Sequence, residues 1–236
     1  MIRRRAAGWT LLGPERHAGS LARLALADDI APLCRLVIRD DPRSFVGVLR
    51  IAGEDFVAKS PRHKDRRRWI RLTTLFRPGL AFRIASFLEE AWSAGLPVPE
   101  PLGALERRRC GGVVESWLFH RYLPGRPCTA SDLQPAAAVL RRLHALGWAH
   151  GDAHIANFLA DGERVWILDA EPRRRIPGGI LEAHDLIRLR NSVGGGTGAE
   201  AIDILGGRRG LAYRIAGAYD RGVHAARAVK RRLRSR

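Results

Sequence analysis

The stretch His-Gly-Asp-Ala-His-Ile-Ala-Asn at residues 150–157, followed by Val-Trp-Ile-Leu-Asp at residues 165–169, holds the densest cluster of groups with catalytic potential. Transfer of a phosphoryl group requires a carboxylate beside the attacking hydroxyl, oxygen ligands for magnesium, and cations on the phosphates. Asp152 would orient the acceptor hydroxyl and accept its proton, whereas Asn157 and Asp169 would bind the metal. The spacing of these three residues predicts a loop that leads into a β-hairpin.

This pattern, His-Gly-Asp-x-x-x-x-Asn followed by an apolar strand that ends in Asp, resembles the catalytic signature of the protein-kinase-like superfamily. The His-Gly-Asp form is similar to that of its bacterial small-molecule and sugar kinases. The resemblance implies a two-lobed α+β fold, with a small antiparallel-sheet N-terminal lobe that carries one helix and a mainly helical C-terminal lobe. It also implies ATP and Mg²⁺ as cofactors.

The sequence Val-Ala-Lys at residues 57–59 resembles the end of the third strand of that superfamily, where a lysine holds the nucleotide phosphates. Only three of the 41 basic residues are lysine, so a lysine at this place is informative. The resemblance therefore gives Lys59 a catalytic role on the phosphates. It also implies that residues 119–123 form the hinge whose backbone binds adenine, through Arg121 and Leu123.

Two further segments are similar to the lipopolysaccharide kinases of the Kdo/WaaP type. Residues 94–102 read Ala-Gly-Leu-Pro-Val-Pro-Glu-Pro-Leu, and residues 184–192 read His-Asp-Leu-Ile-Arg-Leu-Arg-Asn-Ser. The resemblance extends over residues 45–192. It implies transfer of the γ-phosphate of ATP to a sugar hydroxyl of the lipopolysaccharide inner core, on Kdo or heptose. It also implies that Asp185 braces the catalytic loop through backbone N–H groups rather than reacting.

The sequence departs from the superfamily pattern around Lys59. No Gly-x-Gly-x-x-Gly motif precedes the lysine, and only Gly47 lies where a phosphate-covering loop is expected. The superfamily also uses a glutamate of the first helix to hold this lysine. Glu89 and Glu90 lie on the predicted helix, but Ile84 occupies the expected position, so the partner of Lys59 stays open.

Hydrophobic patterning predicts an N-terminal lobe at residues 1–120, in which residues 1–30 form a lead-in without assigned structure. A basic run at residues 62–71 is typical of a solvated loop. Short β-rich runs predict antiparallel strands, and one amphipathic pattern predicts a helix that ends before a glycine and a proline-rich extended segment. The strands are expected at residues 34–38, 45–51, 55–59 and 113–119, the helix at 80–92 and the extended segment at 97–101.

The C-terminal lobe is predicted at residues 121–236. Ser131 and Gln134 have the spacing of a capping box and predict the start of a helix with an apolar face. Asp161 and Gly162 predict the turn of a hairpin. Helices are expected at residues 181–190 and 210–229, separated by a glycine-rich joint at residues 194–198.

Composition limits the class of protein and its partners. The chain has 236 residues with 46% hydrophobic side chains, so it is globular, and 41 Lys and Arg against 24 Asp and Glu give a net charge of +17. Nearly all of these basic residues are arginine, which is typical of a protein from a GC-rich genome. The net positive charge is therefore weak evidence for an anionic binding partner. The three cysteines have no paired spacing, which argues against a disulfide scaffold or a zinc site.

No signal peptide or membrane-spanning segment is predicted, which favours a cytoplasmic protein, soluble or peripheral on the inner face of the inner membrane. The basic tail at residues 221–236 is compatible with docking on an anionic lipid surface and equally with a solvated helix end. The oligomeric state is left open.

Three alternatives to a lipopolysaccharide kinase remain from the sequence. A small-molecule kinase of the aminoglycoside-like kind would need an acidic acceptor pocket, whereas this lobe is basic. A pseudokinase scaffold without catalysis is favoured by the missing glycine loop. Nucleic-acid binding is suggested by charge alone, and no reading motif supports it.

Overall fold

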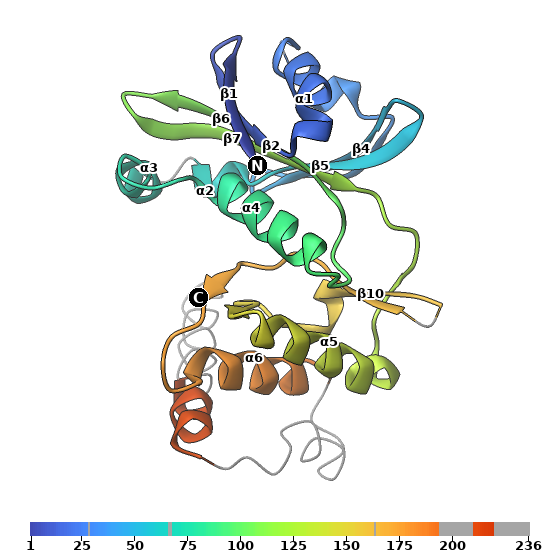
Figure 1. Ribbon diagram of the computed structural model, residues 1–236, viewed down its shortest axis with the longest axis vertical. Coiled ribbons are helices and arrows are strands. Elements are labelled where there is room, and N and C mark those ends of the chain that lie inside the picture. The colour runs from blue at the N-terminus through green and yellow to red at the C-terminus, as the bar shows by residue number, and fades with distance from the viewer. Residues whose placement is uncertain (28, 66–67, 163, 194–209, 220–236) are drawn as a thin grey trace, which may run out of the picture. The chain divides into compact units, whose positions relative to one another are not determined.

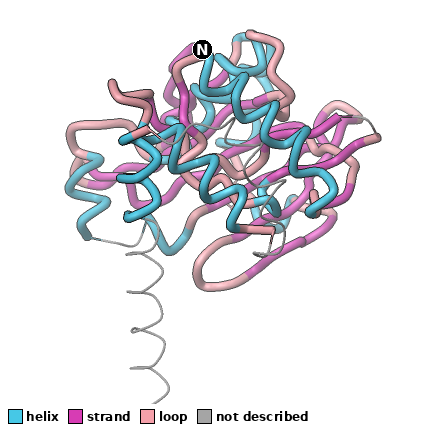
Figure 2. The backbone as a smooth tube through the Cα atoms, turned by 90° about the horizontal axis from the view of Figure 1, so that it is seen from below, coloured by secondary structure: helices cyan, strands magenta, loops and turns pink. Residues whose placement is uncertain are grey.

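The computed structural model describes residues 1–27, 29–65, 68–162, 164–193 and 210–219. The chain divides into two compact units, Met1–Pro124 and Gly125–Arg236. The chain contains both helices and strands, as the tube in Figure 2 shows. None of the described helices has both the length and the apolar character that crossing a bilayer requires.

The first unit is built on an antiparallel sheet whose seven described strands follow the order β1-β2-β6-β7-β5-β4-β3. The strands are β1 (Ile2–Ala6), β2 (Trp9–Gly13), β3 (Leu36–Asp40), β4 (Phe45–Ile51), β5 (Glu54–Ser60), β6 (Pro101–Arg109) and β7 (Gly112–Arg121). The helical elements are η1 (Glu15–His17), α1 (Ala18–Ala25), η2 (Ala31–Leu33), α2 (Arg62–Asp65), α3 (Arg68–Thr74) and α4 (Leu80–Ser93).

Helices cover both faces of this sheet (Figure 1). On one face α1 packs onto a cluster of buried apolar side chains that includes Phe56 and Ala58 of β5. On the other face α4 buries its own apolar stripe against β6 and β7. Because side chains alternate along a strand, Lys59 lies on the α4 face, beside Leu118 of β7. The strand context predicted for Lys59 is therefore present.

The structure confirms the four predicted strands and the predicted helix of this unit, but the sequence analysis missed β1, β2 and β6. The lead-in at residues 1–30 is a hairpin followed by α1. Its turn is Ala7-Gly8, where both residues have positive φ, as a two-residue type I′ turn requires. Alanine is an unusual first residue for this turn, and three consecutive arginines in β1 hide the strand pattern.

The prediction of a solvated loop at residues 62–71 was wrong, because α2 and α3 occupy this segment. The structural reason is Asp65, the one acidic residue of the run. Its side chain is buried, and the Ser116 hydroxyl of β7 donates to it at 2.8 Å. Burial raises the pKa of the Asp65 carboxyl to about 6, and the charges of Glu106 and Glu115 act in the same direction.

Replacement of Asp65 tests this buried contact. The carboxyl is harder to ionise in the folded chain than in the unfolded one, so the free energy of unfolding falls as pH rises through about 4 to 6. Asp65→Asn keeps an acceptor for Ser116 and removes the buried charge. We expect it to stabilise the protein at pH 7.5 by about 1–2 kcal/mol more than at pH 4.5, measured by urea unfolding. An equal effect at both pH values would contradict a raised pKa.

A second buried carboxylate, that of Glu106 on β6, supports the start of α4. Arg108 donates to its Oε2 at 2.9 Å, and burial raises the pKa of Glu106 while Arg108 lowers it. A Cβ placed on Gly79, directly before α4, would lie 2.2 Å from Glu106 Oε1. The glycine therefore gives the carboxylate access to the first turn of α4, where the helix dipole favours negative charge.

The second unit contains α5 (Leu133–Ala145) and α6 (Ile180–Asn191), which contact each other (Figure 1). A hairpin is formed by β10 (Phe158–Asp161) and β11 (Arg164–Ile167), and α5 contacts its second strand. The apolar side chains of α5 at spacings of three and four residues are buried. Helical residues 211–219 pack on α6 through Ala216. The shorter elements are β8 (Arg126–Pro127), η3 (Ala130–Asp132), β9 (Trp148–Ala149), η4 (Ile155–Asn157) and β12 (Arg173–Arg174).

The hairpin at Asp161 and the helix expected at 181–190 are confirmed, but the capping box lies two residues earlier than predicted. Thr129 and Asp132 form it, and Asp132 also receives two hydrogen bonds from Arg126. A single 3₁₀ turn therefore precedes α5 and places Pro135 in its first turn, where proline is tolerated. The glycine joint at 194–198, residues 220–229 of the last helix and the tail lie outside the described residues.

Candidate active site

One buried carboxylate fixes the backbone of the predicted catalytic loop, residues 150–157. Asp185 of α6 is completely buried and accepts the amide of His150 at 2.6 Å and that of Gly151 at 2.9 Å. His144 of α5 approaches the same carboxylate at 3.1 Å. The structure thus confirms the expectation that Asp185 braces the loop. Hydrogen bonds to a charged acceptor are among the stronger ones, about 1.5–3 kcal/mol each.

The far end of the loop is held by Ser192, a residue to which the sequence analysis gave no role. Its hydroxyl accepts the amide of Ile155 at 2.8 Å and donates to the Leu189 carbonyl at 2.6 Å. The segment at residues 184–192 thus braces both ends of the loop, at Asp185 and at Ser192.

The register of the β10–β11 hairpin brings Asn157 next to Asp169. Phe158 pairs with Ile167, and one residue further the Leu168 amide donates to the Asn157 carbonyl at 2.8 Å. Asp169 follows directly. It has φ 48°, the left-handed region that few non-glycine residues adopt and that is often found at functional sites.

Asp152 and Asn157 are in contact within the loop. The Asn157 Nδ2 donates to the Asp152 carbonyl at 2.8 Å and lies 3.4 Å from Asp152 Oδ2. This contact orients the amide, so that its nitrogen is used inside the loop and its oxygen is left as the ligand atom. Asp152, Asn157 and Asp169, the three residues predicted for this site, are therefore held in one frame of the second unit.

Beyond Asp169 the chain is tied back to the catalytic loop. The Glu171 amide donates to the His150 carbonyl at 2.9 Å, and β12 pairs with β9 immediately before the loop. Gly151 makes this approach possible. Its φ is +79°, and a Cβ at this position would lie 2.3 Å from the Glu171 carbonyl oxygen.

His150 has a structural role. Its side chain is completely buried, and its Nδ1 accepts the amide of Asp152 at 3.3 Å. Burial lowers the pKa of His150, although Asp185 and Asp152 act in the opposite direction. The ring is therefore neutral at pH 7, and acidification below its usual pKa destabilises the folded loop.

Arg188 is a second residue of this site, after Ser192, that the sequence analysis missed. It forms an ion pair with Asp152 Oδ1 and lies three residues after Asp185 on α6. Residues three apart share one face of a helix, so the face that braces the loop also presents this guanidinium. The signal was the spacing Asp-x-x-Arg within the segment at residues 184–192.

The oxygen donors of the loop fit a magnesium ion. Mg²⁺ is bound in phosphoryl-transfer enzymes by one or two carboxylates together with substrate phosphates, rather than by a full set of protein ligands. The Asp169 carboxylate and the Asn157 amide oxygen match this chemistry. Among the described residues no group of three or more His, Cys, Asp or Glu side chains forms a complete metal site.

The residues predicted to bind nucleotide lie in the first unit. Lys59 is on β5, and residues 119–123 include the end of β7. The Arg121 amide donates to the Glu100 carbonyl at 2.8 Å and its carbonyl lies 3.0 Å from His120 Nδ1, so both groups already have partners. Leu123 forms no backbone hydrogen bond with the described residues.

Gly47 is not a phosphate-covering glycine. It lies within β4, and a Cβ there would meet the Cys34 sulfur at 2.7 Å, so it serves close packing on the α1 face. The turn between β3 and β4 is closed by Asp41, whose Oδ1 accepts the amides of Arg43 at 2.7 Å and Ser44 at 2.8 Å. These amides are therefore used within the turn.

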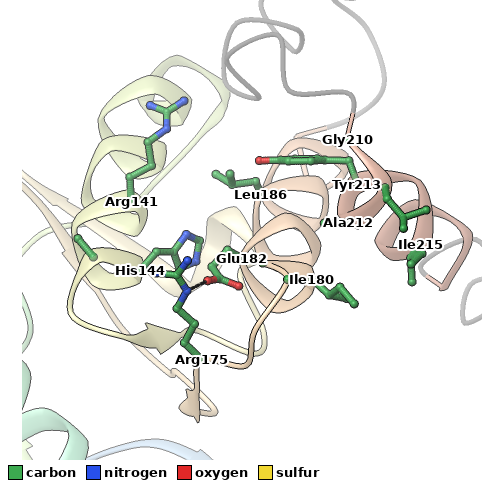
Figure 3. A pocket seen from close by; sticks show the side chains of 14 residues that line it. Arg141, His144, Arg175, Ile180, Glu182, Leu186, Gly210, Ala212, Tyr213 and Ile215 are labelled. Carbon is green, nitrogen blue, oxygen red and sulfur yellow. Dashed lines mark ion pairs between the residues drawn. The ribbon is translucent and has the colours of Figure 1, made fainter.

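Two cavities lie in the second unit. A cavity of about 520 Å³ has Asp152, Arg188 and Arg173 in its wall. The other, of about 1040 Å³, is shown in Figure 3 and lies between α5, α6 and helical residues 211–219. In its wall Arg175 forms an ion pair with Glu182, and its lining does not include Asp152, Asn157 or Asp169. The smaller cavity is therefore the one associated with the loop.

The sheet, the braced loop and the hairpin that ends in Asp169 define a protein of the kinase-like fold. A solved structure of WaaP in complex with acyl carrier protein covers 94% of this chain and 97% of its own, with a TM-score of 0.55 and 17% identity, which establishes the fold. The chain belongs to the lipopolysaccharide kinase (Kdo/WaaP) family, whose sequence model matches residues 67–205.

Two relatives are named 3-deoxy-D-manno-octulosonic acid kinase. The protein of Mannheimia succiniciproducens is 28% identical over 134 residues, covering 48% of this chain and 52% of the relative. That of Pasteurella multocida is 27% identical over 143 residues, covering 55% and 59%. The chain thus spans little more than half the length of these relatives.

Gly151 and Gly147 form a matched pair for testing the loop. Gly147 has φ +78° and open space around a Cβ, whereas Gly151 has φ +79° and a backbone oxygen in the way. Gly147→Ala should cost about 1–2 kcal/mol from backbone conformation alone. Gly151→Ala should cost at least about twice as much, because the loop must move away from Glu171. Urea unfolding measures both, and equal losses would contradict the close approach.

Proposed function

We propose that this chain transfers the γ-phosphate of ATP, with Mg²⁺, to a sugar hydroxyl of the lipopolysaccharide inner core. The observation that carries the proposal is the placement of Asp152, Asn157 and Asp169 on one hydrogen-bonded frame. Family membership and the two relatives named as sugar-acid kinases support this acceptor.

In the proposed reaction the acceptor oxygen forms a bond to the γ-phosphorus. The bond from this phosphorus to the leaving oxygen of ADP breaks, and that oxygen keeps the electron pair. Asp152 holds the hydroxyl in line and takes its proton on a carboxylate oxygen. Asn157 and Asp169 would hold magnesium, which when bound neutralises charge on the phosphates.

The residues of the first unit would bind the nucleotide. Lys59 is proposed to hold the α- and β-phosphates through its ammonium group. Of the two hinge residues, Leu123 is the better candidate for adenine, because both backbone groups of Arg121 already have partners. The adenine contact through Arg121 would require those bonds to break.

Two competing functions are weighed by specific features. A kinase of cationic small molecules is poorly supported, because the cavity at Asp152 contains two arginines as well as two carboxylates. A scaffold that does not transfer phosphate is favoured by the turn between β3 and β4. The backbone amides of this turn donate to Asp41, so they do not face a phosphate. Nucleotide binding and transfer must therefore be measured separately.

Substitution of the aspartates tests the proposed transfer. Asp152→Asn should lower the rate of ATP-dependent labelling of inner-core lipopolysaccharide by at least about 10²-fold, the usual range for loss of a general base. Asp169→Asn should abolish labelling, because a proposed magnesium ligand is lost. Asp161→Asn, at the exposed end of β10, is the matched control and should leave the rate unchanged. Labelling by Asp169→Asn at the wild-type rate would refute the proposed metal role.

Calorimetry separates the enzyme from the scaffold. The wild-type chain should bind ATP in the presence of Mg²⁺, and Lys59→Met should weaken that binding. A wild-type chain that binds neither nucleotide nor sugar would support the scaffold. Binding of nucleotide without labelling of any lipopolysaccharide sugar would support the proposed nucleotide site and contradict the proposed acceptor.

We further propose that α3 attaches the protein peripherally to an anionic membrane surface. Trp69 and Leu72 lie on α3, and Leu75 and Phe76 follow its last residue; together they form an exposed apolar stripe, in which Trp69 is 72% and Phe76 92% exposed. The exposed Arg71 and Arg77 lie in the same stretch of sequence. An exposed apolar stripe with aromatic side chains and flanking cations is typical of helices that lie at the bilayer interface.

Vesicle sedimentation tests this membrane contact. The double substitution Trp69→Ser and Phe76→Ser should lower affinity for vesicles containing phosphatidylglycerol by about tenfold or more, since burial of each such side chain is worth about 1.5–3 kcal/mol. Leu26→Ser, at an exposed apolar residue outside the stripe, is the control. Unchanged binding by the double variant would show that another surface makes the contact.

A further inference from the structure

The cavity beside Asp152 carries a charge pattern that points to a particular class of acceptor. Its wall contains two arginines, Arg173 and Arg188, and two carboxylates, Asp152 and Glu171, together with His184. Its volume of about 520 Å³ lies within the range of small-molecule sites and admits a single sugar. Because the two arginines and two carboxylates balance one another, a ligand with one negative charge leaves a smaller imbalance in this wall than a ligand with two.

Arg188 is the central residue of this cavity. Its side chain is 22% exposed, and it forms the ion pair with Asp152 Oδ1. Its Nε is buried and has no hydrogen-bond partner among the described residues. A guanidinium has five N–H donors arranged as a fork for carboxylates and phosphates. Arg188 therefore has donor capacity beyond Asp152.

Asp152, by contrast, has both oxygens engaged. Oδ1 is paired with Arg188, and Oδ2 lies 3.4 Å from Asn157 Nδ2. A carboxylate oxygen can accept more than one hydrogen bond, but the guanidinium on Oδ1 restricts the directions from which a substrate hydroxyl can approach it. Loosening the ion pair would open that approach.

We propose that Arg188 binds the carboxylate of a sugar-acid acceptor and exchanges Asp152 for it. The acid displaces Asp152 Oδ1 from the guanidinium, and the freed oxygen then accepts the hydrogen bond of the hydroxyl to be phosphorylated. The carboxylate itself is not consumed. This inference rests on the proposed phosphotransferase function and adds the chemical class of its acceptor.

The exchange makes the acceptor's acid group a condition for catalysis. A neutral sugar leaves Asp152 paired with Arg188, and a cationic amino sugar meets the positive charge of Arg188 and Arg173. A phosphate group shares the recognition chemistry but brings up to two negative charges to a wall that is balanced between arginines and carboxylates. A monoanionic carboxylate therefore fits best.

Calorimetry with two probes tests this assignment directly. The probes are the methyl glycoside of 3-deoxy-D-manno-octulosonic acid and the methyl ester of the same compound, which lacks the charge. We expect the wild-type chain to bind the acid at least about tenfold more tightly than the ester, the value of one charge-assisted hydrogen bond. Arg188→Met should bind both probes equally, and Arg188→Lys should keep part of the preference.

Two further variants provide a control and a second test of the exchange. Arg190→Met, on the same helix and outside the cavity wall, should bind both probes like the wild type. Asp152→Ala removes the competing carboxylate, so it should bind the acid more tightly than the wild type although it cannot transfer phosphate. Weaker acid binding by Asp152→Ala, or a preference that persists in Arg188→Met, would overturn the exchange.

Turnover separates this inference from the proposed function. Arg188→Met should raise KM for the acid by about tenfold or more, and because Asp152 is then unpaired without any acid, its kcat on the ester should rise above that of the wild type. Equal loss on both probes would show that Arg188 only supports the loop and would overturn the inference. If the wild-type chain prefers the acid in calorimetry but phosphorylates neither probe nor lipopolysaccharide, the sugar-acid site stands and the proposed function fails. Inorganic phosphate that competes better than the acid would assign the site to a phosphorylated ligand instead.

Discussion

The contact between the Asp185 carboxylate and the amides of His150 and Gly151 is the interaction on which the second unit depends. A buried carboxylate is tolerated only when its hydrogen-bonding capacity is used, and here two backbone groups and His144 use it. The loop cannot shift without leaving that charge without partners. The positions of Asp152, Asn157 and Asp169 then follow along the chain, because the loop continues into η4 and the β10–β11 hairpin.

The second unit was largely predictable because its motifs are local. Asp152, Asn157 and Asp169 are close in sequence, so the loop and a two-stranded hairpin are sufficient to bring them together. What the sequence could not reveal were contacts made across the unit. The pairing of Arg188 with Asp152 and of Ser192 with the Ile155 amide depends on how α6 packs against the loop. The helical spacing of Asp185 and Arg188 was a usable signal only once that packing was known.

The first unit was less predictable because its sheet is assembled from distant pieces. β2, near the N-terminus, pairs with β6, which follows α4, so neither strand could be recognised from a neighbouring partner. The arginine-rich strands β1 and β6 also lack the alternation that marks a half-buried strand, and Arg108 gains its place only through the buried Glu106. Likewise, the basic run became helical because Asp65 is buried against β7, a contact over fifty-one residues.

The backbone hydrogen bonds on both sides of Asp169 have a consequence for inhibitor design. Backbone hydrogen bonds hold the residues on both sides of this aspartate, one from Leu168 to Asn157 and one from Glu171 to His150. Movement of Asp169 away from the loop would break both bonds. Inhibitors that require a displaced Asp169 are therefore disfavoured against this chain.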